Sequence, residues 1–423
     1  MEEDRTDHEH PPETGMIMRI QGGIQMLTLK MIQEAREALD GVIRVTPLNP
    51  TKSLGKNVYI KCENLQLTGA FKLRGAYNKL RTLSPEERER GVIACSAGNH
   101  AQGIALSATR LGMKSVICMP AGAPISKIEA TRNYGAEVVL VPGVYDDAAA
   151  EAKRLCEEEG YTFAHPFNDP YVMAGQGTIG LEILEQLPEV EQIIVPIGGG
   201  GLIAGVACAV KHLKPSCRII GVQAEGAASM WVSRNRGQIT ELSSVSTIAD
   251  GIAVKVPGDL TFELCEKYVD EIVTVRDSEI AAAIMTLMED QKIVSEGAGA
   301  TTVAAILFGK VSAADKKTVC LVSGGNVDVT TLSRIITKGL TKSGRITNVT
   351  TKVVDKPGEL NRLLTVVAQN GANVLSIDHS REDYQSAVNV CVVNLSLETR
   401  DRRHAEDILN SLQENGYPVN WIK

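Results

Sequence analysis

The sequence is poor in aromatic residues, in positive charge and in long apolar runs. Phe, Trp and Tyr make up only 4% of the 423 residues, so Val, Ile, Leu and Ala must supply most of the core. The formal net charge of -7 offers no basic patch for nucleic acid and no polybasic signal for a membrane surface. No apolar stretch approaches the roughly 20 residues of a membrane-spanning helix. We therefore expect a soluble protein without nucleic-acid or membrane partners.

Paired cysteines are also lacking. The nine cysteines are scattered without a CxxC pair, and several lie inside apolar runs. This pattern argues against a disulfide framework or a zinc site and predicts buried free thiols in a reducing compartment. The N-terminus begins with polar residues and has no apolar core of a signal peptide. We expect residues 1–20 to be a disordered extension and the protein to be cytoplasmic.

From about Leu27 the chain alternates between short β-rich runs and alanine-rich helical segments. Helical composition is clearest at residues 100–111 and 147–158. Apolar strands separated by helices predict an α/β fold with mostly parallel sheets covered on both faces. About 300 residues exceed one compact sheet, so we expect a body over 21–340 with two lobes, the smaller at about 66–165. The strand candidates are residues 58–61, 91–95, 114–118, 137–141, 192–196, 218–223 and 318–322.

The character of the sequence changes after Thr337. Residues 338–345 are polar and predict a linker, which we place at 341–346. Beyond it the pattern predicts a strand, a helix, two strands, a helix and a short final strand near Val419. This β-α-β-β-α-β order is the ferredoxin-like arrangement. It predicts a separate C-terminal domain over 347–423.

Four consecutive glycines, Gly198, Gly199, Gly200 and Gly201, follow one apolar strand candidate and precede a helical segment. Their backbone amides can converge on an anion, and the start of the helix adds partial positive charge. The loop predicts a phosphate site without specifying a cofactor. Tight packing of the strand on the helix would also favour glycine, although four exceed what packing requires.

The same loop permits a different interpretation. Gly199, Gly201 and Ala204 satisfy the dinucleotide-binding fingerprint, and Glu225 follows the next strand, where a ribose-binding acid would lie. On these residues alone, a nicotinamide or flavin enzyme stays open.

Lys72 stands between Phe71 and Leu73 at the start of a helical run. A lysine amine in a largely apolar cleft loses its charge more readily than one in water, as a Schiff-base lysine must. A single lysine is nevertheless far more often a solvated surface residue.

Two polar turns follow buried strand candidates. One is Ser96-Ala97-Gly98-Asn99-His100, and the other is Ser323-Gly-Gly-Asn326. Hydroxyl, amide and backbone N–H donors at the end of a strand suit a carboxylate or a phenolic oxygen. A helix N-cap or a plain loop explains each turn equally well.

Taken in order, these segments resemble the fold-type II pyridoxal-phosphate enzymes, and within them the threonine/serine dehydratases. The resemblance covers residues 27–340. The tail from 346 resembles an ACT domain, a small regulatory module that binds amino acids in related enzymes. The matching motifs are residues 69–75, 96–100, 198–201 and 323–326, with weaker support from 174–178, 248–252 and 295–298.

The resemblance implies pyridoxal phosphate as the cofactor. Lys72 would hold it covalently and, once released by substrate, would remove the α-proton. Phe71 would pack against the pyridine ring, Asn99 would bond the ring hydroxyl and Ser323 would face the ring nitrogen. The glycine loop, with the amide of Leu202, would bind the phosphate.

The resemblance also implies how substrate is held. Ser96 and the loop through Ala97, Gly98, Asn99 and His100 would take the substrate carboxylate. Glu296 would lie near the ring.

The implied reaction is dehydration and deamination of L-threonine to 2-oxobutanoate and ammonia, and of L-serine to pyruvate. A neutral Ser323 at the ring nitrogen leaves a weaker electron sink, which favours prompt loss of the β-substituent. Serine racemases of this family carry a second serine where this chain has Ala97, and alanine cannot transfer a proton. Some relatives bind a divalent cation through two acidic residues. Glu225 could be the first, but Trp231 stands at the position of the second, so we expect no metal ion.

Three alternatives remain beside this interpretation. A nucleotide-dependent oxidoreductase would leave Lys72 and both polar turns without a role. A non-catalytic amino-acid sensor would have no need of Lys72. Cysteine-synthase-like β-replacement is the nearest competitor within the family. For the dehydratase we expect an effector such as isoleucine or valine at the ACT domain, and a dimer or tetramer.

Overall fold

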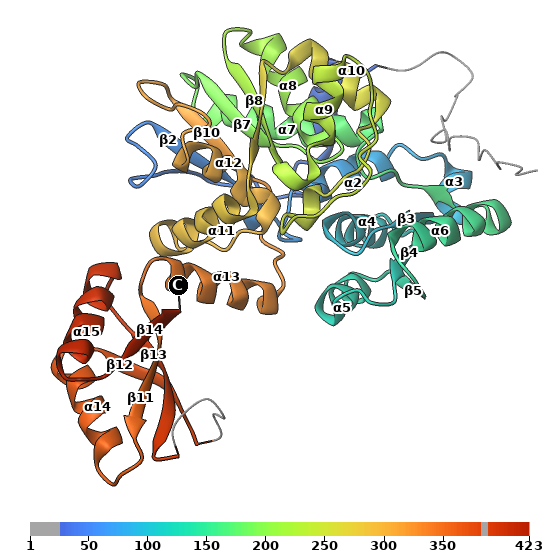
Figure 1. The fold of residues 1–423 in the computed structure, drawn as a ribbon. Helices are drawn as coiled ribbons and strands as arrows, with labels where there is room; N and C mark the ends of the chain where they lie inside the picture. The colour runs from blue at the N-terminus through green and yellow to red at the C-terminus, as the bar shows by residue number, and fades with distance from the viewer. Residues whose placement is uncertain (1–25, 382–387, 423) are drawn as a thin grey trace, which may run out of the picture.

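The computed structural model describes residues 26–381 and 388–422 (Figure 1). The expected extension at 1–20 lies outside the described residues. Two parallel sheets form the larger part of the molecule, and a third, antiparallel sheet forms the C-terminal domain. No described helix is long and apolar enough to cross a membrane. All nine cysteines are free, and all except Cys156 are buried.

The smaller sheet has four parallel strands in the order β5-β4-β3-β6. Its buried side chains alternate between two cores, because successive residues of a strand point to opposite faces. Val92 and Ala94 pack on the side of α4, whereas Ile93 and Cys95 pack on the side of α6. Both faces are therefore covered, as the apolar strands predicted. The elements of this lobe are α2 (Lys72–Leu80), α3 (Pro85–Arg90), β3 (Val92–Cys95), α4 (Asn99–Arg110), β4 (Ser115–Pro120), α5 (Ile125–Asn133), β5 (Glu137–Val141), α6 (Tyr145–Glu159) and β6 (Thr162–Phe163).

The larger sheet has six strands in the order β1-β2-β10-β7-β8-β9, and all are parallel except β1 at the edge. β10 comes from the end of this part of the chain, yet it lies between β2 and β7. This crossover places the turn after β10 beside the segment after β2. The elements are α1 (Leu29–Ala38), β1 (Leu48–Pro50), β2 (Val58–Cys62), α7 (Pro170–Gln186), β7 (Gln192–Pro196), α8 (Gly201–Leu213), β8 (Arg218–Ala224), α9 (Ser229–Arg236), α10 (Asp259–Tyr268), β9 (Glu271–Val275), α11 (Asp277–Thr286), α12 (Gly297–Leu307) and β10 (Thr318–Val322), with short helical turns η1 (Glu63–Leu65), η2 (Glu225–Ala227), η3 (Asp250–Ile252) and η4 (Leu287–Gln291).

The polar stretch 338–345 is helical for most of its length, because α13 (Val329–Lys342) runs through it, so the linker expected at 341–346 is reduced to residues 343–345. Asp328 caps this helix, since its side chain accepts hydrogen bonds from the amides of Thr330 and Thr331. Ile335 packs into the core of the larger lobe, so the polar residues occupy the outer side of an amphipathic helix. Only residues 343–345 separate α13 from the next strand.

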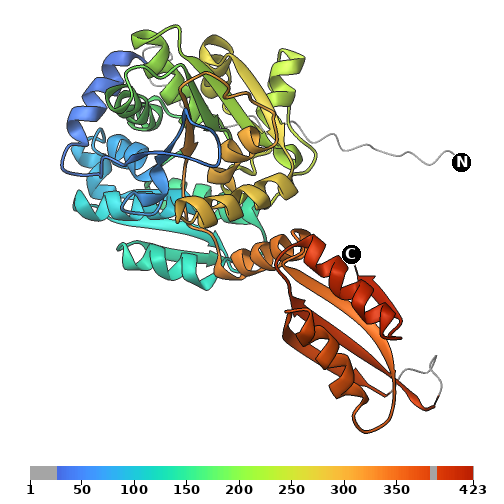
Figure 2. The same cartoon turned by 90° about the vertical axis from the view of Figure 1, so that its left-hand side faces the viewer.

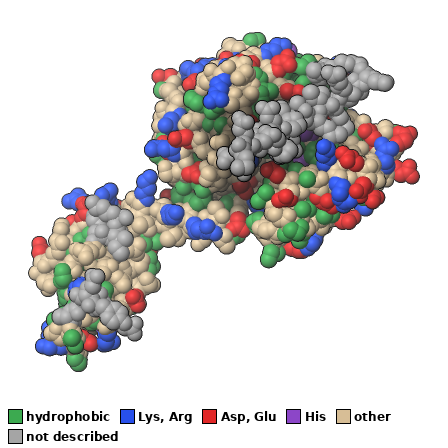
Figure 3. All heavy atoms as spheres, turned by 45° about the vertical axis from the view of Figure 1, so that its right-hand side comes forward, with side chains coloured by type: hydrophobic (Ala, Val, Ile, Leu, Met, Phe, Trp, Pro, Cys, Tyr) green, Lys and Arg blue, Asp and Glu red, His purple; other side chains and the backbone are tan. Residues whose placement is uncertain are grey.

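The C-terminal domain has the predicted β-α-β-β-α-β order, with β11 (Ile346–Val354), α14 (Glu359–Gln369), β12 (Asn373–Ser380), β13 (Val390–Glu398), α15 (Arg402–Glu414) and β14 (Val419–Ile422). The antiparallel sheet has the order β12-β13-β11-β14, which confirms the ferredoxin-like fold. Leu363, Val367 and Leu412 of the two helices pack on Val349 and Leu395 of the sheet. The domain stands apart from the two lobes, with α13 between them (Figures 1 and 2). Charged side chains of both signs are scattered over the face drawn in Figure 3.

Candidate active site

Lys72 is the first residue of α2, and two contacts with the turn after β10 fix its position. Ala70 pairs with Gly324 in an isolated β-bridge, and the Phe71 amide donates to the Ser323 carbonyl at 3.1 Å. The Lys72 Nζ points to the segment before α7, where it donates to the Pro166 carbonyl at 2.7 Å. Burial lowers the pKa of Lys72 to about 8, although the nearby Glu296 carboxylate opposes the shift. A substantial fraction of the Lys72 amine is therefore neutral near physiological pH.

A buried ion network anchors α2 two residues beyond Lys72. The Arg74 guanidinium is fully buried and bonds both oxygens of Glu63 at 2.8 Å. On its other side Arg74 donates to Glu182 on α7 at 2.6 Å, and Lys61 donates to the same carboxylate at 2.6 Å. Burial alone would lower the pKa of Arg74, but the two carboxylates raise it, so the guanidinium stays charged. The network ties β2, α2 and α7 together beneath the lysine.

The turn 96–100 joins the turn 323–326 through their asparagines. Asn326 Nδ2 donates to Asn99 Oδ1 at 2.8 Å and to the Thr68 carbonyl at 2.7 Å. Gly98, rather than a serine or asparagine, is the N-cap of α4, so the interpretation of this turn as a side-chain cap is wrong. Ser96 Oγ instead accepts the Gly98 amide at 3.1 Å. The two turns that the sequence left open thus belong to one hydrogen-bonded cluster.

Glu296, which precedes α12, completes this cluster. Its two carboxylate oxygens accept hydrogen bonds from Asn99 Nδ2, each at 2.9 Å. Burial raises the pKa of Glu296 to about 7, even though the bonds from Asn99 favour the charged form. The carboxyl therefore changes its charge near neutral pH. A Cβ on Gly324 would lie 2.6 Å from Glu296 Oε1, which explains why a glycine stands there.

The imidazole of His100, the residue after Asn99, is neutral. Its Nε2 lies 2.8 Å from the Ala164 carbonyl, and burial together with the Lys72 charge lowers the pKa of His100 to about 3. A neutral imidazole bonded to a backbone carbonyl orients the loop and does not supply a proton at neutral pH.

The glycine loop lies beside the segment that accepts the Lys72 hydrogen bond. A Cβ on Gly199 would lie 2.4 Å from the Phe167 ring, and a Cβ on Gly201 would lie 2.7 Å from the Phe167 carbonyl. Gly200 has φ +97° and is the N-cap of α8. Close packing is therefore one reason for the glycines.

The loop also leaves backbone donors at the start of α8. The first N–H groups of a helix have no partner within it. Among the described residues, the amides of Gly199, Gly200, Gly201 and Leu202 donate to no other backbone group. These four donors at a helix start fit a phosphate group. Their role in binding it stays a prediction.

Ser96, Gly198 and Ser323 each follow the carboxyl end of a parallel strand, namely β3, β7 and β10. With Lys72 they provide an amine of lowered pKa, two hydroxyl groups and a cup of backbone donors. This set of groups fits pyridoxal phosphate, whose carbonyl, ring and phosphate need such partners. The roles of Phe71, Asn99, Leu202 and Ser323 toward it stay predictions.

A pocket of about 610 Å³ lies between the two lobes and α13, and none of the predicted site residues lines it. Lys127 of α5 and Asp250 form an ion pair of 2.7 Å at this pocket, and both charges act on the Glu296 carboxyl. Thr331 and Arg334 of α13 line the same pocket. The helix that leads to the C-terminal domain therefore lines a pocket that also holds two charged residues acting on Glu296.

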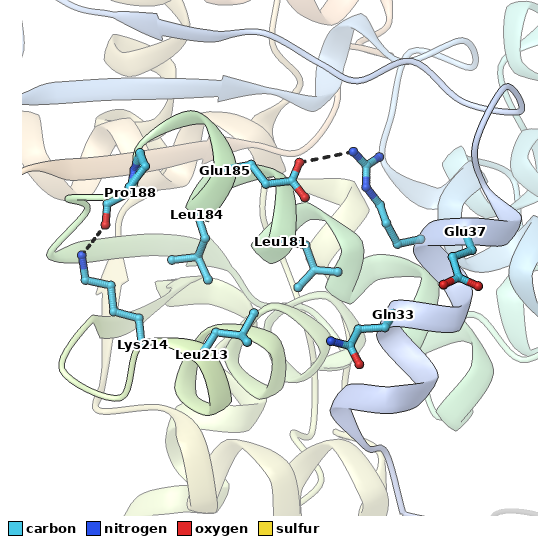
Figure 4. A pocket seen from close by; sticks show the side chains of 9 residues that line it. Gln33, Glu37, Leu181, Leu184, Glu185, Pro188, Leu213 and Lys214 are labelled. Carbon is cyan, nitrogen blue, oxygen red and sulfur yellow. Dashed lines mark hydrogen bonds and ion pairs between the residues drawn. The ribbon is translucent and has the colours of Figure 1, made fainter.

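A second pocket of about 780 Å³ lies elsewhere, between α1, α7 and α8. Figure 4 shows Gln33, Leu181 and Leu213 around it, and none of the predicted site residues lines it. Glu225 and Trp231 are both exposed. Nothing in the sequence indicated Pro166 and Phe167, which connect Lys72 to the glycine loop.

The pKa of Lys72 predicts how cofactor loading depends on pH. Only the neutral amine can attack the cofactor carbonyl, so covalent loading of the cofactor-free protein should accelerate with pH and level off above about 8. The rise of the visible absorption band after mixing with pyridoxal phosphate measures this rate. Glu296→Gln removes the charge that favours the ammonium form, so the profile should move to lower pH. A loading rate that is constant between pH 6.5 and 8.5, roughly the range set by that pKa, would contradict the role of Lys72 as the residue that binds the cofactor.

Comparison with known proteins gives a consistent result. A family model described as pyridoxal-phosphate dependent enzyme matches residues 39–325. The L-threonine ammonia-lyase of Thermotoga maritima is 52% identical over 401 residues, which span 94% of this chain and 100% of that protein. The L-threonine ammonia-lyase of Geobacter sulfurreducens is 47% identical over 402 residues, again 94% of this chain and 100% of that protein.

Solved structures match about three quarters of the chain. The processed form of threonine deaminase isoform 2 from Solanum lycopersicum has a TM-score of 0.69 at 41% identity, over 73% of this chain and 92% of that one. Maize serine racemase has a TM-score of 0.70 at 38% identity, over 75% of this chain and 99% of that one. The family match includes the glycine loop, so the dinucleotide interpretation of Gly199, Gly201 and Glu225 is wrong.

Proposed function

The chain belongs to the pyridoxal-phosphate-dependent enzymes, and we propose that it converts L-threonine to 2-oxobutanoate and ammonia, and L-serine to pyruvate and ammonia. The observation that carries the proposal is that Lys72, at the start of α2, lies with the turns 96–100 and 323–326 and the glycine loop, which follow the carboxyl ends of the parallel strands β3, β10 and β7. The relatives that match the chain over both of its parts are named L-threonine ammonia-lyases, which supports the same reaction.

When bound, pyridoxal phosphate withdraws electrons from the substrate Cα and so acidifies its proton. The Lys72 amine is placed to take that proton, because its lowered pKa keeps a fraction of it neutral. Ser96 and the amides of its turn would orient the substrate carboxylate, although the amides of Ser96 and Gly98 already donate to the Cys118 carbonyl and to Ser96 Oγ. The substrate then loses its β-hydroxyl as water, and hydrolysis of the released enamine returns one water. One oxo acid and one ammonia are therefore formed per amino acid.

Ala97 favours elimination over racemisation. It lies in the turn 96–100, only partly buried, and its methyl group carries no transferable proton. Of Lys72 and Ala97, only Lys72 can then exchange a proton with the substrate. The substrate can lose its α-proton to Lys72 but cannot regain one from residue 97.

Incubation of the holoenzyme with L-threonine and with L-serine, followed by oxo-acid assay and chiral analysis, tests this proposal. Equimolar oxo acid and ammonia are expected, and the amino acid left at partial conversion should remain the L isomer. Accumulation of D-serine without oxo acid would favour racemisation. A product formed only after a thiol nucleophile is added would favour β-replacement.

We also propose that the C-terminal domain is an ACT domain that binds an amino acid such as isoleucine or valine and pairs with a second copy. Its β12 is an edge strand with exposed Leu375 and Ile377, which suits pairing between subunits. α13 joins the domain to the pocket that holds the Lys127–Asp250 ion pair, so a shift of the domain would move residues close to charges that act on Glu296.

A shortened chain that ends at Ser343 tests this regulation. The full chain should change its rate of oxo-acid formation when isoleucine or valine is added, whereas the shortened chain should keep a basal rate and lose the response. The two lobes retain their own cores in the shortened chain. An identical response of the two proteins would place the effector site outside the C-terminal domain.

A further inference from the structure

One cluster of side chains in the C-terminal domain has no part in the site described above. Asp355 follows β11, His379 lies in β12 and Cys391 lies in β13. One ligand atom from each residue lies within 4.8 Å of the other two. Among residues 26–381 and 388–422, no other group of three His, Cys, Asp or Glu side chains is arranged in this way.

The register of the sheet assembles this cluster. β13 lies between β12 and β11, and Cys391 pairs with Val353 of β11. His379 pairs with Val393, which points to the same face as Cys391 because residues two apart in a strand share a face. The Asp355 amide donates to the Asn389 carbonyl at 2.8 Å, which holds Asp355 at the end of the same sheet. Three neighbouring strands thus deliver the three side chains to one corner of the domain.

The ligand atoms already face one another. His379 Nε2 lies 2.8 Å from Cys391 Sγ, a separation within the range of hydrogen bonds to the smaller oxygen atom. Cys391 is buried, His379 is partly buried and Asp355 is exposed, so the cluster has an open side toward solvent. A fourth ligand such as water can reach it from that side.

Arg381 holds the carboxylate of this cluster without blocking it. Its Nε and Nη2 donate to the two oxygens of Asp355 at 2.8 and 3.1 Å. A carboxylate has about four lone-pair sites, and this bidentate pair uses two of them. Carboxylates that bind metals commonly carry such an additional hydrogen-bond partner, which fixes their orientation.

We propose that Asp355, His379 and Cys391 form a binding site for a zinc-type transition-metal ion, with one carboxylate oxygen, one imidazole nitrogen, one sulfur and a water as ligands. Zn²⁺ accepts all three side-chain types in four-coordinate sites. Sulfur and nitrogen ligands exclude Ca²⁺ and Mg²⁺, which take oxygen. As the Sγ–Zn bond forms, the Cys391 S–H bond breaks and the proton passes to solvent. The site is independent of the reaction proposed above.

Titration of the full-length holoenzyme with Co²⁺ tests the site, because Co²⁺ replaces Zn²⁺ and is visible by absorption. Difference spectra against the metal-free holoenzyme should show sulfur-to-cobalt charge transfer and the d–d bands of a four-coordinate site. The bands should saturate at one Co²⁺ per chain and disappear when Zn²⁺ is added. Holoenzyme that shows no sulfur-to-cobalt band at saturating Co²⁺ would overturn the proposal and leave a thiol–imidazole hydrogen bond only.

Variants separate this site from other thiols. Cys391→Ser should remove the charge-transfer band. Asp355→Asn, at an exposed position, should weaken Co²⁺ binding about 10-fold or more without affecting the fold. Cys208→Ala is the matched control, because Cys208 Sγ lies 3.8 Å from His212 Nδ1 without a carboxylate, and it should keep the full signal. A band that survives Cys391→Ser, or that is lost in Cys208→Ala, would contradict the assignment.

Discussion

Lys72→Ala is expected to lower the rate of oxo-acid formation from L-threonine by about 10⁴-fold, because in the proposed reaction Lys72 is both the covalent anchor of the cofactor and the base that takes the α-proton. The fold should persist, since the amine makes a single hydrogen bond to the Pro166 carbonyl and its removal takes a charge out of a buried position. Steady-state assay of oxo acid measures the rate, and circular dichroism measures the fold.

Borohydride reduction followed by peptide mass analysis gives a second readout of the same variant. Wild-type protein should carry the reduced cofactor on the peptide that contains Lys72, and Lys72→Ala should carry none. Lys79→Ala is the control on the same helix, because Lys79 pairs with Asp169 at the far end of α2 and should leave both labelling and turnover in place. A Lys72→Ala protein that keeps more than about 1% of the wild-type rate would contradict the role given to this lysine.

Arg74→Ala is expected to destabilise the catalytic body by about 3–5 kcal/mol, the cost of breaking a buried ion pair by removing one partner. Without the guanidinium, Glu63 keeps only the Thr46 hydroxyl, and Glu182 must share Lys61 and the more distant Arg36. Urea unfolding followed by circular dichroism should show a lower midpoint than for the wild type.

An exposed arginine supplies the comparison for this experiment. Arg154 pairs with Glu151 and Glu158 on the surface of α6, and Arg154→Ala should leave the midpoint unchanged because water screens exposed pairs. Arg74→Lys should recover only part of the lost stability, since a lysine cannot bond two carboxylates with a planar fork. Equal midpoints for Arg74→Ala and the wild type would show that the network does not hold α2.

The strands of the two lobes were predictable because both faces of each sheet are covered. Such strands are continuous apolar runs, and all seven that the sequence indicated are present. β9 was not indicated, since Thr274 interrupts its apolar run, whereas the edge strand β5 keeps such a run although none of its residues is fully buried. The polar stretch 338–345 suggested a linker because most of its residues lie on the solvent side of α13. Their polar side chains reflect exposure to solvent and not a lack of helical structure.

The parts of the candidate site that follow a local sequence pattern were predictable. A strand followed by glycine, serine or asparagine marks the end of a parallel sheet, and this pattern identified the turns at 96–100, 198–201 and 323–326. The bond between Asn326 and Asn99 and the position of Phe167 against Gly199 depend on how distant segments pack. No local pattern carries that information. The same holds for His379 and Cys391, which only the register of the C-terminal sheet brings together.

The central claim is that this chain uses a cofactor bound to Lys72 to deaminate threonine, and one spectrum tests it most directly. The visible absorption of the purified holoenzyme is recorded before and after addition of L-threonine, and 2-oxobutanoate is assayed in the same cuvette. The predicted result is a cofactor band that shifts on mixing while the oxo acid accumulates. A band that shifts without any oxo acid would contradict the reaction, and a protein that stays colourless after incubation with pyridoxal phosphate would contradict the site itself.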